Sequence, residues 1–81
     1  MARSQAVAKR STLDDQWQEL MSLCESEARY TREGRHPRIL KIIVTRIAEL
    51  GAEMGFSPRR IATREFRAER DGGRITRLIT D

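Results

Sequence analysis

The feature that most constrains this chain is an abrupt break in a helical pattern within residues 50–66, LGAEMGFSPRRIATREF. Gly55 favours the left-handed backbone conformation that ends a helix. Two residues later, Ser57 offers a hydroxyl that can cap a new helix, and Pro58 has its φ preset for the first helical position. Because apolar residues flank the break on both sides, the segment predicts two helices joined by a tight turn, a helix-turn-helix.

Aligned as a DNA-binding helix-turn-helix of about twenty residues, this segment resembles that of bacterial transcription regulators. The stretch GFSPRRI is especially similar to the second DNA-reading unit of AraC-type activators. In this alignment Gly51 falls where the two helices approach closely, whereas Arg64 stands at a position that is usually apolar in the family. The resemblance implies that the second helix reads DNA. An ordinary helical hairpin without DNA contact fits the same residues.

The rest of the chain predicts an all-α fold. Helices are expected over residues 12–30, 37–54 and 58–70, which gives a small three- to four-helix domain over residues 12–81 with a helix-turn-helix-like core. Residues 1–11 are basic and contain little to bury, so they predict a disordered, flexible tail. The end of the chain, RITRLITD, predicts a short helix or an ordered tail packed on the core. A hairpin turning at Asp71-Gly-Gly, a wing, is the alternative.

Apolar residues at spacings of three and four predict which faces form the core. On the first helix they give one stripe: Leu13, Trp17, Leu20, Met21, Cys24 and Ala28. The second helix is apolar over much more than a stripe, so it must be covered on several sides. That surface either provides a dimer face or is consumed by the core of a monomer, and the sequence leaves both open.

The composition argues against an enzyme. A chain of 81 residues has room for one small domain, and it contains no Gly-rich phosphate loop, nucleophile elbow or paired-acid site. Cys24 and His36 have no partners at metal-ligand spacing, so we expect no metal, no cofactor and no small-molecule substrate. No apolar run approaches the roughly 20 residues that span a bilayer. We therefore expect a cytoplasmic protein that is not associated with a membrane.

The charges are separated along the chain. Residues 12–33 contain six acidic and two basic residues, whereas residues 57–81 contain seven arginines and four acidic residues. Arginine suits phosphates, guanine edges and acidic protein surfaces alike. If the third helix enters a major groove, Arg59, Arg60 and Thr63 are the expected base readers, with Arg64 and Arg67 on phosphates. The candidate residues for binding DNA or a partner are therefore Ser57, Arg59, Arg60, Thr63, Arg64 and Arg67.

Two functions fit these patterns. The first is a small transcription regulator that contacts DNA through its Arg-rich third helix, acting as a homodimer if it reads two half-sites. The second is an antiactivator, which binds a transcriptional activator by protein–protein contact through apolar or acidic positions such as Glu27 and Tyr30. In general character the Arg-rich run over residues 35–81 is similar to QseM-type antiactivators. That resemblance implies quorum-sensing activators of mobile-element transfer as partners. Direct DNA contact is the slightly favoured hypothesis.

Overall fold

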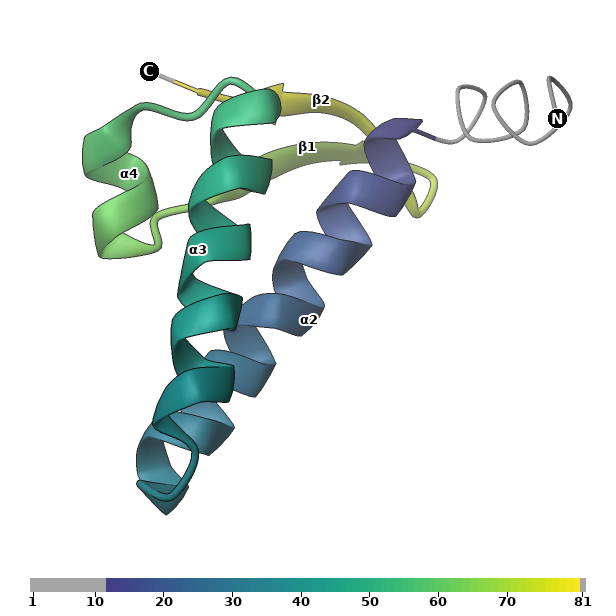
Figure 1. Cartoon of the computed structure of the whole chain (residues 1–81). Helices are drawn as coiled ribbons and strands as arrows, with labels where there is room; N and C mark the ends of the chain where they lie inside the picture. The colour runs from purple at the N-terminus through teal and green to yellow at the C-terminus, as the bar shows by residue number, and fades with distance from the viewer. Residues whose placement is uncertain (1–11, 81) are drawn as a thin grey trace, which may run out of the picture.

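The structure is a computed structural model that describes residues 12–80, and Figure 1 shows its elements in chain order. Helix α2 spans Thr12–Glu33, α3 spans Pro37–Glu53, and the short α4 spans Pro58–Thr63. Two antiparallel strands follow, β1 at Arg67–Asp71 and β2 at Arg74–Ile79. The tail expected over residues 1–11 lies outside the described residues.

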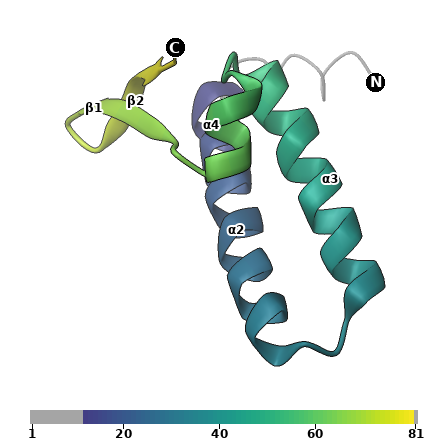
Figure 2. The ribbon, with the colours of Figure 1, turned by 90° about the vertical axis from the view of Figure 1, so that its left-hand side faces the viewer.

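The two long helices form an antiparallel hairpin that supplies most of the core (Figure 2). Pro37 occupies the first turn of α3, where its missing N–H costs nothing. From α2, Trp17 and Leu20 are buried, as the apolar stripe predicts, but Ala28 at the end of that stripe is exposed. The core is completed from α3 and the turn after it by Ile43, Ile47, Leu50, Met54 and Phe56.

The turn between α3 and α4 follows its local sequence. Gly55 has a φ of 95°, and the N–H of Phe56 donates to the carbonyl of Gly51 at 3.0 Å. The Ser57 hydroxyl accepts a hydrogen bond from the N–H of Arg60 at 3.3 Å, and Pro58 begins the helix. The local signals therefore predicted the helix-turn-helix shape of this segment correctly.

The prediction of an all-α fold is wrong, because residues 67–79 form a β-hairpin. The helix expected over residues 58–70 ends at Thr63, where Arg64 adopts a left-handed conformation with φ 60° and ψ 33°. Gly72 and Gly73 both have positive φ, as a two-residue hairpin turn between right-twisted strands requires. The hairpin that starts at Asp71-Gly-Gly, the alternative in the sequence analysis, is the one that forms.

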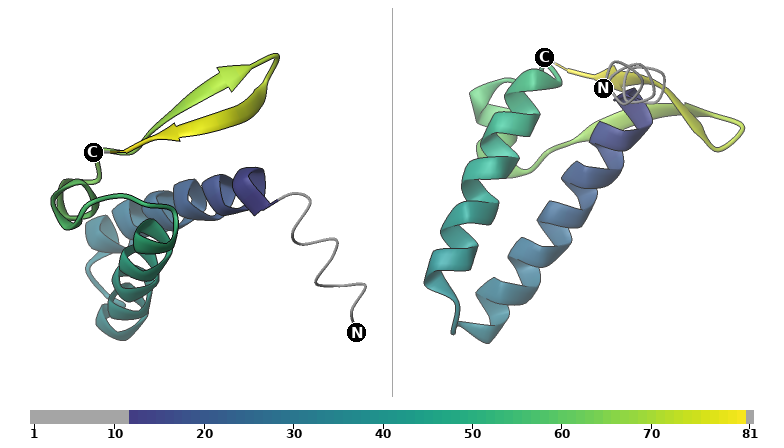
Figure 3. Two further views of the ribbon diagram at one scale, coloured as in Figure 1. Left: turned by 90° about the horizontal axis from the view of Figure 1, so that it is seen from above. Right: turned by 45° about the vertical axis from the view of Figure 1, so that its right-hand side comes forward.

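Packing against the helices explains why the hairpin forms. Seen from above, β1 and β2 make a layer of their own beside the helices (Figure 3). Ala68, Ile75 and Leu78 are partly buried against the core, and the N–H of Ile75 donates to Asp14 Oδ1 of α2 at 3.2 Å. The register slips between Glu69 and Arg70, which marks a bulge. A continuous helix over this stretch would forgo the strand pairing and the Asp14 contact.

Candidate functional site

The residues expected to read DNA lie on or beside α4, but this helix is only six residues long. Arg59 and Thr63 are exposed, and the Thr63 hydroxyl donates to the carbonyl of Arg59 at 3.0 Å. Arg60 is half-buried, and its Nη1 donates to the carbonyl of Glu65 at 3.4 Å. Ser57 is the helix cap described above. At a rise of about 1.5 Å per residue, α4 extends over only about 9 Å.

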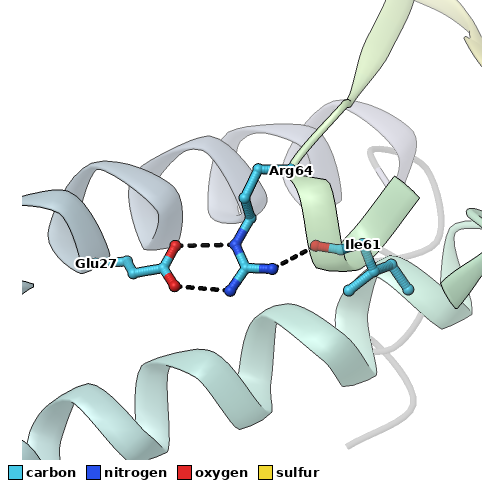
Figure 4. Close-up of polar contacts among 3 residues, drawn as sticks. All are labelled: Glu27, Ile61 and Arg64. Atoms are coloured by element: carbon cyan, nitrogen blue, oxygen red, sulfur yellow. Dashed lines mark hydrogen bonds and ion pairs between the residues drawn. The ribbon is translucent and has the colours of Figure 1, made fainter. Parts of the chain in front are cut away.

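Arg64 and Glu27, predicted as separate binding residues, bind each other (Figure 4). The Arg64 guanidinium donates from Nε to Glu27 Oε1 at 2.9 Å and from Nη2 to Oε2 at 2.6 Å. A further hydrogen bond runs from Nη1 to the carbonyl of Ile61. The two side chains are only 28% and 22% exposed. The hydrogen bond to Glu27 raises the pKa of Arg64 above its usual value, so this arginine is charged and ties the end of α4 to α2.

Cys24 lies next to this ion pair and packs against the core. Burial raises the pKa of its thiol, the Arg64 charge partly opposes that rise, and Glu27 adds to it. A thiol with a raised pKa is a poor nucleophile at neutral pH. The side chain therefore acts as a small apolar residue, in line with its place on the α2 stripe.

Tyr30, the other candidate for a protein contact, lies near the opposite end of the helical hairpin, close to the α2–α3 connection. Its ring meets the His36 ring edge-on, with centroids 5.2 Å apart, and the Arg29 guanidinium lies 5.2 Å from its centroid. His36 Nε2 is 3.5 Å from Glu33 Oε1. Tyr30 therefore contacts Arg29 and His36, whereas Glu27, about one helical turn earlier on α2, binds Arg64 at the end of α4.

An apolar groove lies between α3 and α4, along the hydrophobic run of residues 39–54 that could leave a groove for an apolar helix of a partner. It has a volume of about 440 Å³ and is lined by Val44, Ala48, Ala52, Pro58, Ile61, Ala62 and Arg64. On α3 the lining residues recur every four positions, so they share one face of the helix. That face lies beside the core-facing residues and is left open because α4 is too short to cover it. The small residues spaced by four were the available sequence signal.

The hairpin carries a second group of exposed charges. Arg67 is the first residue of β1 rather than part of a helix, and its side chain is exposed. Arg70, Arg74 and Arg77 are exposed on the same two strands. Arg77 Nε lies 3.4 Å from Glu69 Oε1, a solvent-exposed pair. These four arginines all lie on the hairpin that follows α4 in the chain. Of the four, the sequence predicts only Arg67 as a binding residue.

Comparison with known proteins does not identify a relative. The chain matches no family model, no curated protein and no solved structure. Among residues 12–80, no cluster of His, Cys, Asp or Glu side chains is arranged to hold a metal ion. Within the same residues, no helix combines the length and apolar character needed to cross a membrane. The groove between α3 and α4 and the exposed arginines of the hairpin are two candidate binding surfaces among the described residues.

Proposed function

We propose that this chain is a protein-binding regulator of transcription, an antiactivator that holds an apolar segment of a transcriptional activator in the α3–α4 groove. The observation that carries the proposal is the open apolar lining over Val44, Ala48, Ala52 and Ala62. An amphipathic helix that lays its apolar face into a hydrophobic groove is a common mode of peptide recognition. The small side chains on α3 leave room for larger ones from the partner.

The surroundings of α4 favour protein contact over reading of DNA. Arg64, which was expected to bind phosphate, makes its three hydrogen bonds within the chain. The outward side of α4 offers Arg59 and Thr63, fewer side chains than a recognition helix normally directs at base edges. Acidic α2 and the basic hairpin also give the molecule opposite charges on different elements. Such polarity orients a protein partner and speeds its association.

The groove is tested by placing a charge in it. In a reporter strain that contains a quorum-sensing activator and its target promoter, we expect the unchanged chain to lower reporter output. We expect Ala62→Arg to lose this repression, with binding to the purified activator weakened about tenfold or more, because a guanidinium would be buried without a partner.

The matched control for this experiment is Ala28→Arg, which introduces the same residue at an exposed position of α2. The control should repress and bind like the unchanged chain. Circular dichroism and thermal unfolding establish that both variants are folded. If a folded Ala62→Arg variant represses and binds as well as Ala28→Arg, the groove is not the binding site.

Direct DNA contact is the second candidate, and the hairpin is the observation that favours it. A β-hairpin directly after a helix-turn-helix is placed like a wing, and here it presents Arg67, Arg70 and Arg74 on exposed positions. Exposed arginines on a hairpin suit the phosphate backbone, which is bound without sequence specificity. This candidate relies on the hairpin as much as on α4.

An amide NMR titration with a generic DNA duplex separates the two candidates. DNA binding predicts shifts at Arg59, Arg70 and Arg74 that weaken steeply with salt. It also predicts that Arg70→Gln with Arg74→Gln lowers the salt dependence by about one unit of slope per lost phosphate contact. The antiactivator proposal predicts no shifts at physiological salt. Shifts that persist there and vanish in the double variant would favour DNA as the target.

A further inference from the structure

One face of α3 is left uncovered by both the core and the groove. The core takes Ile43, Ile47 and Leu50, whereas Ile42 on the other side of the helix is 68% exposed. A shallow hollow of about 360 Å³ surrounds Ile42 and is lined by Lys41, Ile42, Thr45, Arg46 and Glu49. Ile39 on the same helix is 42% exposed, so α3 exposes more than one large aliphatic side chain outside the core, and clustered rather than single exposed apolar side chains are what mark an interaction surface.

The charges along this face are separated by sign. Arg38 and Lys41 are exposed on the N-terminal half of α3, and Glu49 and Glu53 are exposed on its C-terminal half. Arg46, between them, donates from Nε to Glu19 Oε2 of α2 at 2.9 Å, and its Nη1 lies 3.8 Å from Glu49 Oε1 on the same helix. The face therefore has a basic half and an acidic half with Ile42 and Thr45 between them.

A surface with this pattern is complementary to itself. When two such helices pack antiparallel, the basic half of each lies over the acidic half of the other, and the apolar centres meet. A parallel arrangement would set like charges against each other. A two-fold axis perpendicular to the helices produces the antiparallel arrangement, and both copies then use the same patch. A different protein would have no need to match both halves.

We infer that a second copy of this chain docks on the exposed α3 face, with the two α3 helices antiparallel about a two-fold axis near Thr45. Ile42 supplies the apolar contact at the centre, and Arg38 and Lys41 of each copy face Glu49 and Glu53 of the other. The inference goes beyond the proposed function. The proposed dimer uses the face of α3 that adjoins the groove. Its test needs only the purified chain, without an activator or DNA.

Charge reversal tests this interface without assuming a register. Sedimentation equilibrium of the unchanged chain is expected to show a monomer–dimer equilibrium. In the variant R38E/K41E, Arg46 is the one basic side chain left among these charged positions of α3, and in the variant E49K/E53K all of these positions are basic. Each is expected to raise the dimer dissociation constant at least tenfold, because each two-fold contact then opposes like charges. An equimolar mixture of the two variants is expected to form a heterodimer.

The control is R70E/R74E, which changes the net charge by the same amount as R38E/K41E but lies on the hairpin. It should dimerise like the unchanged chain. Circular dichroism checks that every variant is helical, and the heterodimer in the mixture shows that the reversed chains are competent to associate. A monomeric unchanged chain at millimolar concentration would overturn the inference, as would a mixture that remains monomeric. The groove variant Ala62→Arg lies on α4, so failure of the dimer and failure of the groove are distinguishable.

Discussion

Replacing Gly51 by leucine is expected to push α4 away from α3 and to lower the free energy of unfolding by about 2 to 3 kcal/mol. A Cβ atom at position 51 would lie 2.8 Å from Ile61 Cγ1, closer than such carbon atoms approach, and 3.1 Å from Ile61 Cδ1, which is a tight contact. Phe66 Cε1 follows at 3.7 Å, so the ring blocks the alternative direction. Leucine favours helix over glycine by roughly 0.8 kcal/mol, which is less than the cost of the overlap.

Urea unfolding monitored by circular dichroism measures this loss of free energy of unfolding. In thermal unfolding, the midpoint temperature of the Gly51→Leu variant should be lower by about 10 to 20 °C in a domain of this size. The matched control is Ala28→Leu, which places the same side chain at an exposed helical position outside the groove. Equal stability of the two variants would contradict the close approach of α3 and α4. Because Ile61 and Ala62 also line the groove, Gly51→Leu should weaken activator binding too.

Removing the Arg64 side chain is expected to cost about 1 to 2 kcal/mol of stability, between the values typical of exposed and fully buried ion pairs. Arg64→Ala removes the bidentate bond and leaves the Glu27 carboxylate, only 22% exposed, without its cation. A double-mutant cycle with Glu27→Ala isolates the pair from the effects of each truncation. A coupling energy near zero in urea unfolding would show that the pair does not hold α4.

Arg64→Gly separates the backbone contribution from the ion pair. Arg64 has a φ of 60°, which glycine adopts more readily than other residues. The glycine variant should therefore be more stable than the alanine variant by about 1 kcal/mol, although both lack the guanidinium. The hydrogen bond to Glu27 raises the pKa of Arg64 in the folded chain. The contribution of the charged guanidinium to the free energy of unfolding is therefore present at every pH below the normal arginine range, and it is lost only in strong alkali. The difference in free energy of unfolding between the unchanged chain and Arg64→Ala should therefore be the same at pH 7 and pH 9.

The Arg64–Glu27 pair also accounts for the departure from the AraC-type pattern. A position that is usually apolar in that helix-turn-helix holds an arginine here, and its charge is met by a carboxylate 37 residues earlier in the chain. The resemblance to DNA-binding regulators predicted that this segment reads DNA, but the Arg64 side chain fastens α4 to α2. A shared turn shape does not imply a shared function, because function depends on which side chains the shape presents.

The candidate site was only partly predictable. Glycine, serine and proline at the α3–α4 turn act on their own backbone, so the position of Arg59, Thr63 and the start of α4 follows from the sequence. The groove and the exposed α3 face do not. The sequence shows that α3 is apolar around most of its surface. Which of these apolar residues are buried in the core depends on where α2 and α4 pack against the helix.

The sequence by itself determined the two long helices, the break between α3 and α4, and the start of α4, because caps, prolines and apolar spacing act over a few residues. Only the tertiary structure decided the fate of residues 64–79. Ile75, Leu78 and Ile79 fit the periodicity of a helix as well as that of a strand, so local preference did not choose. Contact with α2, through the core and through Asp14 to Ile75, selected the hairpin. The same packing brought Glu27 to Arg64, and no local pattern records a contact between residues so far apart.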